Sequence, residues 1–97
     1  MPTYISLINW TEKGVAGFRD TVDRAEAGKA LAAKFGGALK EIYWTVGPYD
    51  IVAITEATDD ESATAFALSL AAQGNVRTTT LRAFSGDEMR SIIAKVG

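Results

Sequence analysis

The residues best suited to chemistry gather around one predicted turn and the strand after it. Residues 46–57 read VGPYDIVAITEA, where a Gly-Pro dipeptide precedes Tyr49 and Asp50, and the following apolar run retains one acid, Glu56. Glycine and proline suit a chain reversal, and Asp50 can accept a hydrogen bond from a turn amide. A reversal does not require the large aromatic side chain of Tyr49. The Tyr-Asp pair therefore has two interpretations, a structural turn or a ligand contact.

A second chemistry depends on the register between the strands on either side of this turn. In the register of a tight hairpin, Glu41 faces Glu56, and two opposed carboxylates repel unless something compensates for them. Lys40, Arg82, a bound cation or a raised carboxyl pKa could do so, and paired acids with displaced pKa values are typical of acid-base catalysis. A one-residue bulge would separate them. The alternative is a pair of solvated or salt-bridged acids at the sheet rim.

The segment RTTTLR, residues 77–82, places three hydroxyl and two guanidinium groups in one strand. Threonine is a good strand former on a half-wet surface, which is the structural interpretation. The functional interpretation is a lining that binds an anion or a carbonyl group, with Arg82 as its charge. Five polar side chains of the sequence could converge on a ligand pocket. They are Tyr43, Tyr49, Asp50, Glu56 and Arg82.

The composition excludes several classes of site. The chain has no cysteine and no histidine, so disulfides, thiolate nucleophiles, Cys-His zinc sites and Ser-His-Asp triads are ruled out. No acidic loop has calcium-binding spacing, and we expect neither a metal nor a cofactor. Ten Lys and Arg against twelve Asp and Glu give a net charge of −2, which favours neither nucleic acid nor an anionic membrane as partner.

The same sequence features set expectations for size and location. The length of 97 residues predicts a single domain over residues 1–97. The first ten residues lack the basic and apolar regions of a signal peptide, and no apolar run approaches the roughly 20 residues that span a bilayer. We therefore expect a cytoplasmic protein.

Hydrophobic periodicity predicts four strands and three helices. The strands are expected at residues 3–10, 38–46, 50–57 and 75–84, and a loop is expected at residues 11–17. Helices are expected at residues 18–35, from a Thr58 or Asp59 cap to Gly74, and after Ser85, where Glu88 completes a capping box. This β-α-β-β-α-β order with an added C-terminal helix predicts an α+β, ferredoxin-like fold. Its four-stranded antiparallel sheet carries both long helices on one face.

The uncovered face of that sheet is the most informative feature of the pattern. Both parities of the strand at residues 3–10 are largely apolar, and so are both parities of the hairpin. Because a large exposed apolar face is unusual for a soluble monomer, we expect a second copy to cover it, with the last helix assisting. The alternative is that the last helix alone folds back over the sheet. The residues chosen as interface candidates are Tyr4, Ile8, Trp10 and Trp44.

Several blocks of the chain resemble the GYD-domain family, small bacterial and archaeal proteins named for a Gly-x-Tyr-Asp stretch. The blocks are PTYISLINWTEKG, EIYWTVG, GPYDIVAITEATDDESATAFALSL and GNVRTTTLRAF, which together cover essentially the whole chain. The motif corresponds to Gly47, Tyr49 and Asp50. The resemblance implies a ferredoxin-like fold of the dimeric α/β-barrel type. It implies no established activity and no catalytic residues, so the motif positions enter only as candidates.

Three functional hypotheses follow. The first is a homo-oligomeric module that binds or senses a small molecule in a pocket at or near the subunit interface. The second is a cofactor-independent enzyme of isomerase or monooxygenase type, whose general base would have to be Asp50, Glu41, Glu56 or a tyrosine. The third is a structural or partner-binding subunit. The sequence favours binding over catalysis and identifies neither the ligand nor the oligomer size.

Overall fold

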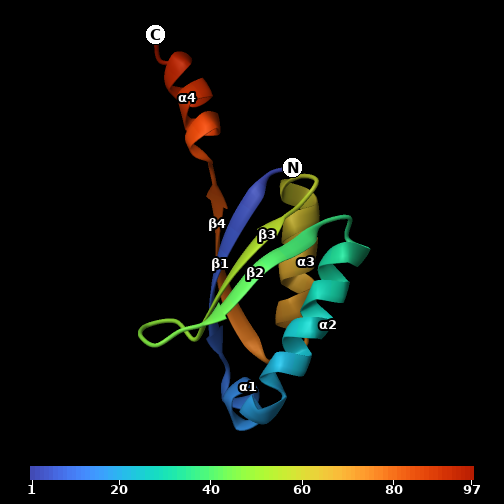
Figure 1. The fold of residues 1–97 in the computed structure, drawn as a ribbon. Helices are drawn as coiled ribbons and strands as arrows, with labels where there is room; N and C mark the ends of the chain where they lie inside the picture. The colour runs from blue at the N-terminus through green and yellow to red at the C-terminus, as the bar shows by residue number, and fades with distance from the viewer.

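Four antiparallel strands form the sheet, in the order β2-β3-β1-β4. The structure, a computed structural model, describes all residues 1–97. The strands are β1 (Thr3–Trp10), β2 (Ala38–Trp44), β3 (Ile51–Glu56) and β4 (Val76–Ala83). The helices are α1 (Glu12–Ala16), the short 3-10 turn η1 (Phe18–Asp20), α2 (Thr21–Lys34), α3 (Asp60–Ala72) and α4 (Gly86–Ala94). Helices α2 and α3 lie side by side on one face of the sheet, which confirms the ferredoxin-like prediction (Figure 1).

Side-chain caps fix where the helices begin. The Asp59 carboxylate accepts a hydrogen bond from the Ser62 amide at 2.8 Å and starts α3. Ser85 and Glu88 form the predicted capping box of α4, with reciprocal bonds of 3.1 and 2.9 Å. Each bond satisfies an amide that has no partner within its helix. These two helix starts were therefore readable from the sequence.

The segment predicted as a loop at residues 11–17 contains the short helix α1 instead. Thr11 caps it by accepting from the Gly14 amide at 3.1 Å. Gly14 is buried against the backbone of Asn75, the residue before β4. A Cβ atom on Gly14 would lie 1.9 Å from the Asn75 carbonyl oxygen. Gly14 therefore serves the close approach of two backbones, and its presence does not mark an open loop.

The register of the β2–β3 hairpin differs from the tight-hairpin expectation. Trp44 pairs with Ile51 and Glu41 pairs with Ile54, while a bulge between Leu39 and Glu41 shifts the remaining pairs by one residue. The predicted opposition of Glu41 and Glu56 is therefore wrong. The connection is longer than a tight turn, and the bulge adds a further offset, so the two acids belong to different levels of the sheet.

The structure shows which strand residues face the helices and which face away from them. Tyr4 and Ile8 are buried beneath the helices, and Trp10 and Trp44 share their face, where the Trp44 indole donates to the Thr21 hydroxyl of α2 at 2.9 Å. The choice of Tyr4, Ile8, Trp10 and Trp44 as interface candidates therefore has the wrong parity. Tyr4 and Ile8 are buried between the layers and Trp10 packs against the Ile8 cluster, whereas Trp44 is 40% exposed on the same face. The residues of opposite parity form the open face.

Helix α4 does not fold back over the sheet. It continues beyond the end of β4, away from both layers (Figure 1). The resulting shape measures 51 × 30 × 18 Å, and its 14.5 Å radius of gyration exceeds the roughly 12.5 Å expected for a compact chain of this length. The single chain thus leaves the open face of its sheet uncovered by any of its own helices.

Candidate functional site

The open face of the sheet is an apolar surface built from all four strands. Because side chains alternate along a strand, the residues opposite in parity to Ile8 and Ala53 share this face. Leu81 is 46% exposed and Tyr43 is 55% exposed, while the remaining members are half-buried by their neighbours alone. We call the large aliphatic and aromatic residues of this face the open-face cluster. Its members are Ile5, Leu7, Tyr43, Val52, Ile54 and Leu81.

Tyr43 is the polar member of the open-face cluster. Its phenol donates a hydrogen bond of 2.7 Å to the Glu41 carboxylate, two residues earlier on the same face of β2. This bond favours the protonated phenol and raises the pKa of Tyr43, and the negative charge of Glu41 adds to the shift. The pair places one hydroxyl and one carboxylate at the edge of an otherwise apolar surface.

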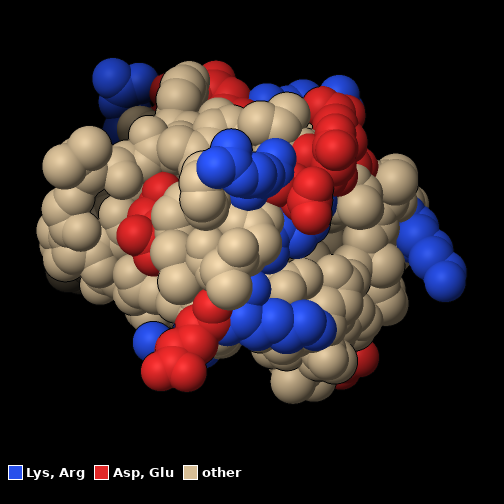
Figure 2. All heavy atoms as spheres, turned by 90° about the horizontal axis from the view of Figure 1, so that it is seen from below, with Lys and Arg blue, Asp and Glu red and all other residues tan.

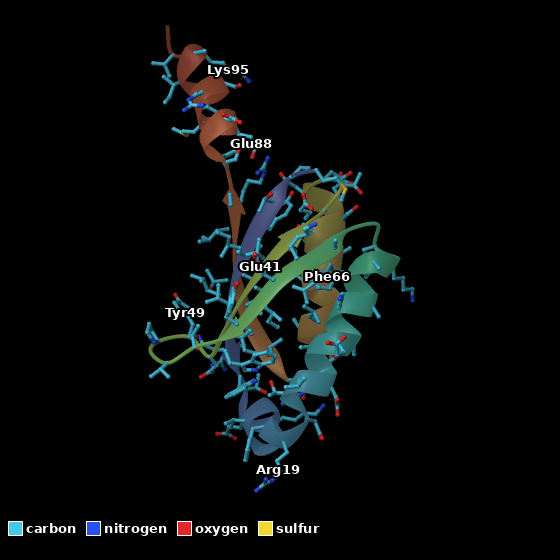
Figure 3. The ribbon with its side chains drawn as sticks, viewed as in Figure 1. Arg19, Glu41, Tyr49, Phe66, Glu88 and Lys95 are labelled. Carbon is cyan, nitrogen blue, oxygen red and sulfur yellow. The ribbon has the colours of Figure 1, made fainter.

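The β2–β3 loop projects from the open side of the sheet, with Tyr49 near its base (Figure 3). Asp50 has a structural role here, because its carboxylate accepts from the Trp10 amide at 2.9 Å while its own amide donates to the Ile8 carbonyl at 2.9 Å. It thereby extends the pairing of β1 with β3 by one further step. Tyr49 is half-buried, and its carbonyl accepts from the Thr45 hydroxyl at 2.7 Å.

Glu56 lies at the other end of β3 from this loop. Its carboxylate forms an ion pair of 3.5 Å with the ammonium group of Lys40 at the bulge of β2. Both side chains are partly solvated, so the pair contributes little to stability. Among the possible partners for Glu56, the fold thus supplies Lys40. Six residues of extended strand, about 20 Å, separate Glu56 from Asp50.

Arg82 belongs to a third location, at the end of β4. Its guanidinium lies 4.5 Å from the centre of the Phe84 ring and 5.7 Å from that of Tyr4, and 3.6 Å from the Glu88 carboxylate. The Tyr4 phenol donates to the Asp60 carboxylate, which raises the pKa of Tyr4. Arg82 and its neighbours thus tie the start of α4 to the sheet.

The five ligand candidates therefore do not converge on one pocket. Tyr43 lies on the open face, Tyr49 and Asp50 at the loop, Glu56 at the opposite end of β3, and Arg82 on the helix-side parity of β4. No group of three or more Asp and Glu side chains is close enough to hold a metal ion. The arrangement does not assemble an acid-base pair from Glu41, Glu56 and Asp50.

The largest open space in the molecule lies between the sheet and the helices instead. A cavity of about 90 Å³ lies between the sheet and helices α2 and α3, and a smaller cavity of about 20 Å³ adjoins it. Phe66 of α3 lines both and lies between the helices and the sheet (Figure 3). The larger cavity is mainly apolar. Its lining includes Ile8, Trp10, Leu39, Ile42, Ile51, Ala53, Leu70 and Val76.

Six polar residues of this cavity were missed by the sequence reasoning. They are Ser6, Thr21, Arg24, Thr55, Gln73 and Asn75. A signal existed for Ser6 and Thr55, because they interrupt apolar positions on the covered parity of their strands. Finding it required knowing which parity faces the helices. Arg24 lines the cavity because of the way α2 is rotated about its axis, and the sequence does not specify that rotation.

The surface at the α1 end of the molecule carries charges of both signs and has no patch of one sign alone. Lys and Arg side chains alternate with Asp and Glu among uncharged residues on this end of the molecule (Figure 2). None of the helices has both the length and the apolar character required to span a bilayer.

Comparisons with known proteins place the chain among relatives. The family model described as "GYD domain" matches residues 4–93. A protein of Thermus thermophilus named "Glutamine synthetase and cystathionine beta-lyase binding protein" is 36% identical over 84 residues, covering 86% of this chain and 88% of the relative.

Two solved structures are similar in fold. TTHA0845 from Thermus thermophilus superposes with a TM-score of 0.58 at 27% identity, over 89% of this chain and 96% of that one. The crystal structure of MtbAldR superposes with a TM-score of 0.69 at 14% identity, over 87% of this chain, which spans about half (52%) of that longer protein. This second likeness concerns the fold alone. With the family model matching nearly its full length, the chain belongs to the GYD domain family.

Proposed function

We propose that this protein is a cytoplasmic, homo-oligomeric binding module that assembles through its open sheet face. The observation that carries the proposal is the open-face cluster, which no helix of the chain covers. Burial of apolar surface contributes roughly 25 cal/mol per Å², and a large contiguous apolar surface is rare on a monomer. A second copy placed back to back with the first removes both open faces from water at once.

The isolated chain also buries few of its own residues. Only eight of 97 residues are buried, and no large side chain is completely enclosed. A chain of this length has a small core by geometry, and association is a common supplement. Self-association of the open face therefore supplies the burial that the single chain lacks.

The assembly is tested by sedimentation velocity of the wild type, Leu7→Glu and Ala30→Glu. Leu7 belongs to the open-face cluster, whereas Ala30 is exposed on α2, on the far side of the molecule. We expect the wild type and Ala30→Glu to sediment at twice the 10.3 kDa chain mass or more, and Leu7→Glu to sediment as a folded monomer. A wild type that is monomeric at micromolar concentration would overturn the proposal.

We further infer that the oligomer binds a protein partner through α4, and that this partner is a metabolic enzyme. The Thermus relative is named as a protein that binds glutamine synthetase and cystathionine beta-lyase. In this chain, α4 presents Met89 and Ile93 to solvent, with Ile93 57% exposed, and Val96 is exposed just beyond the end of the helix. An amphipathic helix held clear of the body is a common form of recognition element.

This binding is tested with purified glutamine synthetase and cystathionine beta-lyase of the same host, immobilised for surface plasmon resonance. We expect binding by the wild type and by Ser91→Glu, and at least tenfold weaker binding by Ile93→Glu with the oligomer intact. Dissociation of the oligomer by Ile93→Glu would assign α4 to self-association and contradict the partner role. Absence of binding to both enzymes would contradict it as well.

No catalytic step is proposed for this module. The enzyme hypothesis required a general base near a pocket, and the three carboxylates considered for it lie apart, two of them engaged with Lys40 and with the Trp10 amide. The small-molecule hypothesis had placed a pocket at or near the subunit interface. The cavity between the layers gives that hypothesis a different location.

A further inference from the structure

The cavity between the layers results from the small residues that the helices turn toward the sheet. Helix α2 contributes Ala25 and Gly28 to its lining, and the nearest atom to a Cβ built on Gly28 is a Leu70 methyl group 4.0 Å away. On the sheet, Ala53 lies opposite. Protein interiors normally leave few voids larger than a water molecule, which needs about 10–15 Å³. The space of about 90 Å³ is several times larger.

The Thr55 hydroxyl borders this space. Thr55 is 7% exposed and lines both cavities, and its side chain makes no hydrogen bond within the chain. No enclosed side-chain polar atom of the chain lacks a partner, so the Thr55 hydroxyl oxygen is accessible from the cavity. A polar group of a bound molecule could therefore take the place of water as its hydrogen-bond partner.

The only charged side chain in the larger cavity is cationic. Arg24 donates from Nη2 to the carbonyl oxygens of Gly14 and Gly17, both at 2.9 Å, which fixes its position. Its remaining N–H groups have no partner, no carboxylate lies within 4 Å of it, and no acid lines that cavity. A held guanidinium with free donors favours a carboxylate as the complementary group.

Arg24 and Thr55 lie at opposite ends of the cavity, among other polar lining residues that include Ser6 and Asn75. Thr55 pairs with Tyr4 near the start of β1, whereas the carbonyls that hold Arg24 follow the end of that strand. Ile8 and Ile51 pair with each other between these levels, and Phe66 and Leu70 face them from α3. The cavity thus has a cationic end, a mainly apolar middle that includes the Ser6 hydroxyl, and the Thr55 hydroxyl at its far end.

We propose that the cavity between the sheet and helices α2 and α3 binds a small apolar monocarboxylate. The carboxylate meets the Arg24 guanidinium, the apolar body lies against Ile8, Ile51 and Phe66, and a polar group at the far end meets Thr55. The site lies within one chain, so it is independent of the assembly and of the partner binding proposed above. A bound molecule would fill the core and stabilise the protein by linkage.

The test uses octanoate, octanamide and 8-hydroxyoctanoate as probes, with binding followed by amide chemical shifts and by melting temperature. For the wild type we expect saturable binding of octanoate, at least fivefold weaker binding of the uncharged octanamide, and tighter binding of 8-hydroxyoctanoate. The shifts should map to Ala53, Thr55 and α2. Shifts that are absent, that do not saturate, or that map to Val52 and Ile54 of the open face would overturn the proposal.

Variants assign the roles within the cavity. Arg24→Gln should weaken octanoate at least tenfold and remove its advantage over octanamide, and Thr55→Val should remove the advantage of the hydroxylated probe. Ala25→Leu should abolish binding by filling the cavity, whereas the matched exposed variant Ala27→Leu should bind as the wild type does. Since Ala25→Leu leaves Arg24 in place, a folded Ala25→Leu protein that still binds octanoate would contradict the site.

One further variant separates this proposal from the assembly. Leu7→Glu changes the open face only, so we expect it to bind octanoate with the wild-type affinity whether it is a monomer or an oligomer. Loss of octanoate binding in a folded Leu7→Glu protein would assign the ligand to the interface and overturn the location proposed here.

Discussion

Both faces of the sheet carry large apolar residues, but helices cover only one of them. The covered face carries Tyr4, Ile8 and Ile51. Among them lie Ser6, Ala53 and Thr55, beneath helices that offer alanine and glycine, and this layer retains open space. The uncovered face carries Ile5, Leu7 and their large apolar neighbours without any helix above them. Small residues thus leave space within the core, and bulky apolar residues lie where water would be. Each face is incomplete in the single chain, one lacking an occupant and the other lacking a cover.

The strongest way to break this comparison is to make the same truncation on each face. Ile8→Ala removes a buried side chain of the covered face and should lower the free energy of unfolding by about 2–4 kcal/mol at every protein concentration. Ile54→Ala on the open face should cost about 1 kcal/mol in dilute protein and more where the oligomer forms. Urea unfolding at two protein concentrations checks both. Equal, concentration-independent losses would show that the faces do not differ.

A smaller effect is expected at the point where β1 and β3 join, because both faces depend on it. Asp50→Ala leaves the Trp10 amide without its acceptor and should lower the free energy of unfolding by about 1–3 kcal/mol. Asp50→Asn retains an acceptor oxygen and should lose about half as much. Urea unfolding measures the two. If Asp50→Asn and Asp50→Ala lost the same amount, the charge would matter more than the hydrogen bond.

The smallest expected effect is a pH dependence of stability, and it arises at the helix caps, outside both faces of the sheet. Hydrogen bonds from the Ser62 and Ser85 amides hold the pKa values of Asp59 and Glu88 below their usual range. A carboxyl whose pKa is lower when folded contributes stability above its unfolded pKa and loses it as pH falls through the folded value. Melting temperature should therefore fall below about pH 4. Asp59→Asn should flatten that fall, and an unchanged slope would exclude Asp59 as its source.

The elements and their order could be read from the sequence because local signals specify them. Asp59, Ser85 and Glu88 are caps with a clear spacing, and Gly74 adopts the positive φ that ends α3. The parity of the sheet could not be read, because Tyr4 and Ile8 on one side and Ile5 and Leu7 on the other are all apolar. Periodicity identifies an amphipathic strand only when one side is polar.

The site was harder to anticipate than the fold for a related reason. The register of β2 depends on a bulge at Lys40 and on the length of the loop, neither of which the residue types specify. The length of the loop already places Glu41 opposite Ile54 instead of Glu56, and the bulge moves Glu56 one residue further along, opposite Ala38. The cavity depends on how far α2 stands from the sheet, which follows from the sizes of Ala25, Gly28 and Leu70 acting together.

Because α4 is separated from the body of the protein, the stability of this helix depends on whether another molecule covers it. At nine residues it is too short to persist in water through helix propensity alone, so beyond its capping box it depends on whatever covers its apolar stripe. Backbone amides in a bare helix of this length exchange with solvent deuterium almost as fast as an unstructured peptide, whereas a covered helix exchanges slowly. Deuterium uptake at residues 90–96 therefore reports occupancy directly, without a label or a mutation.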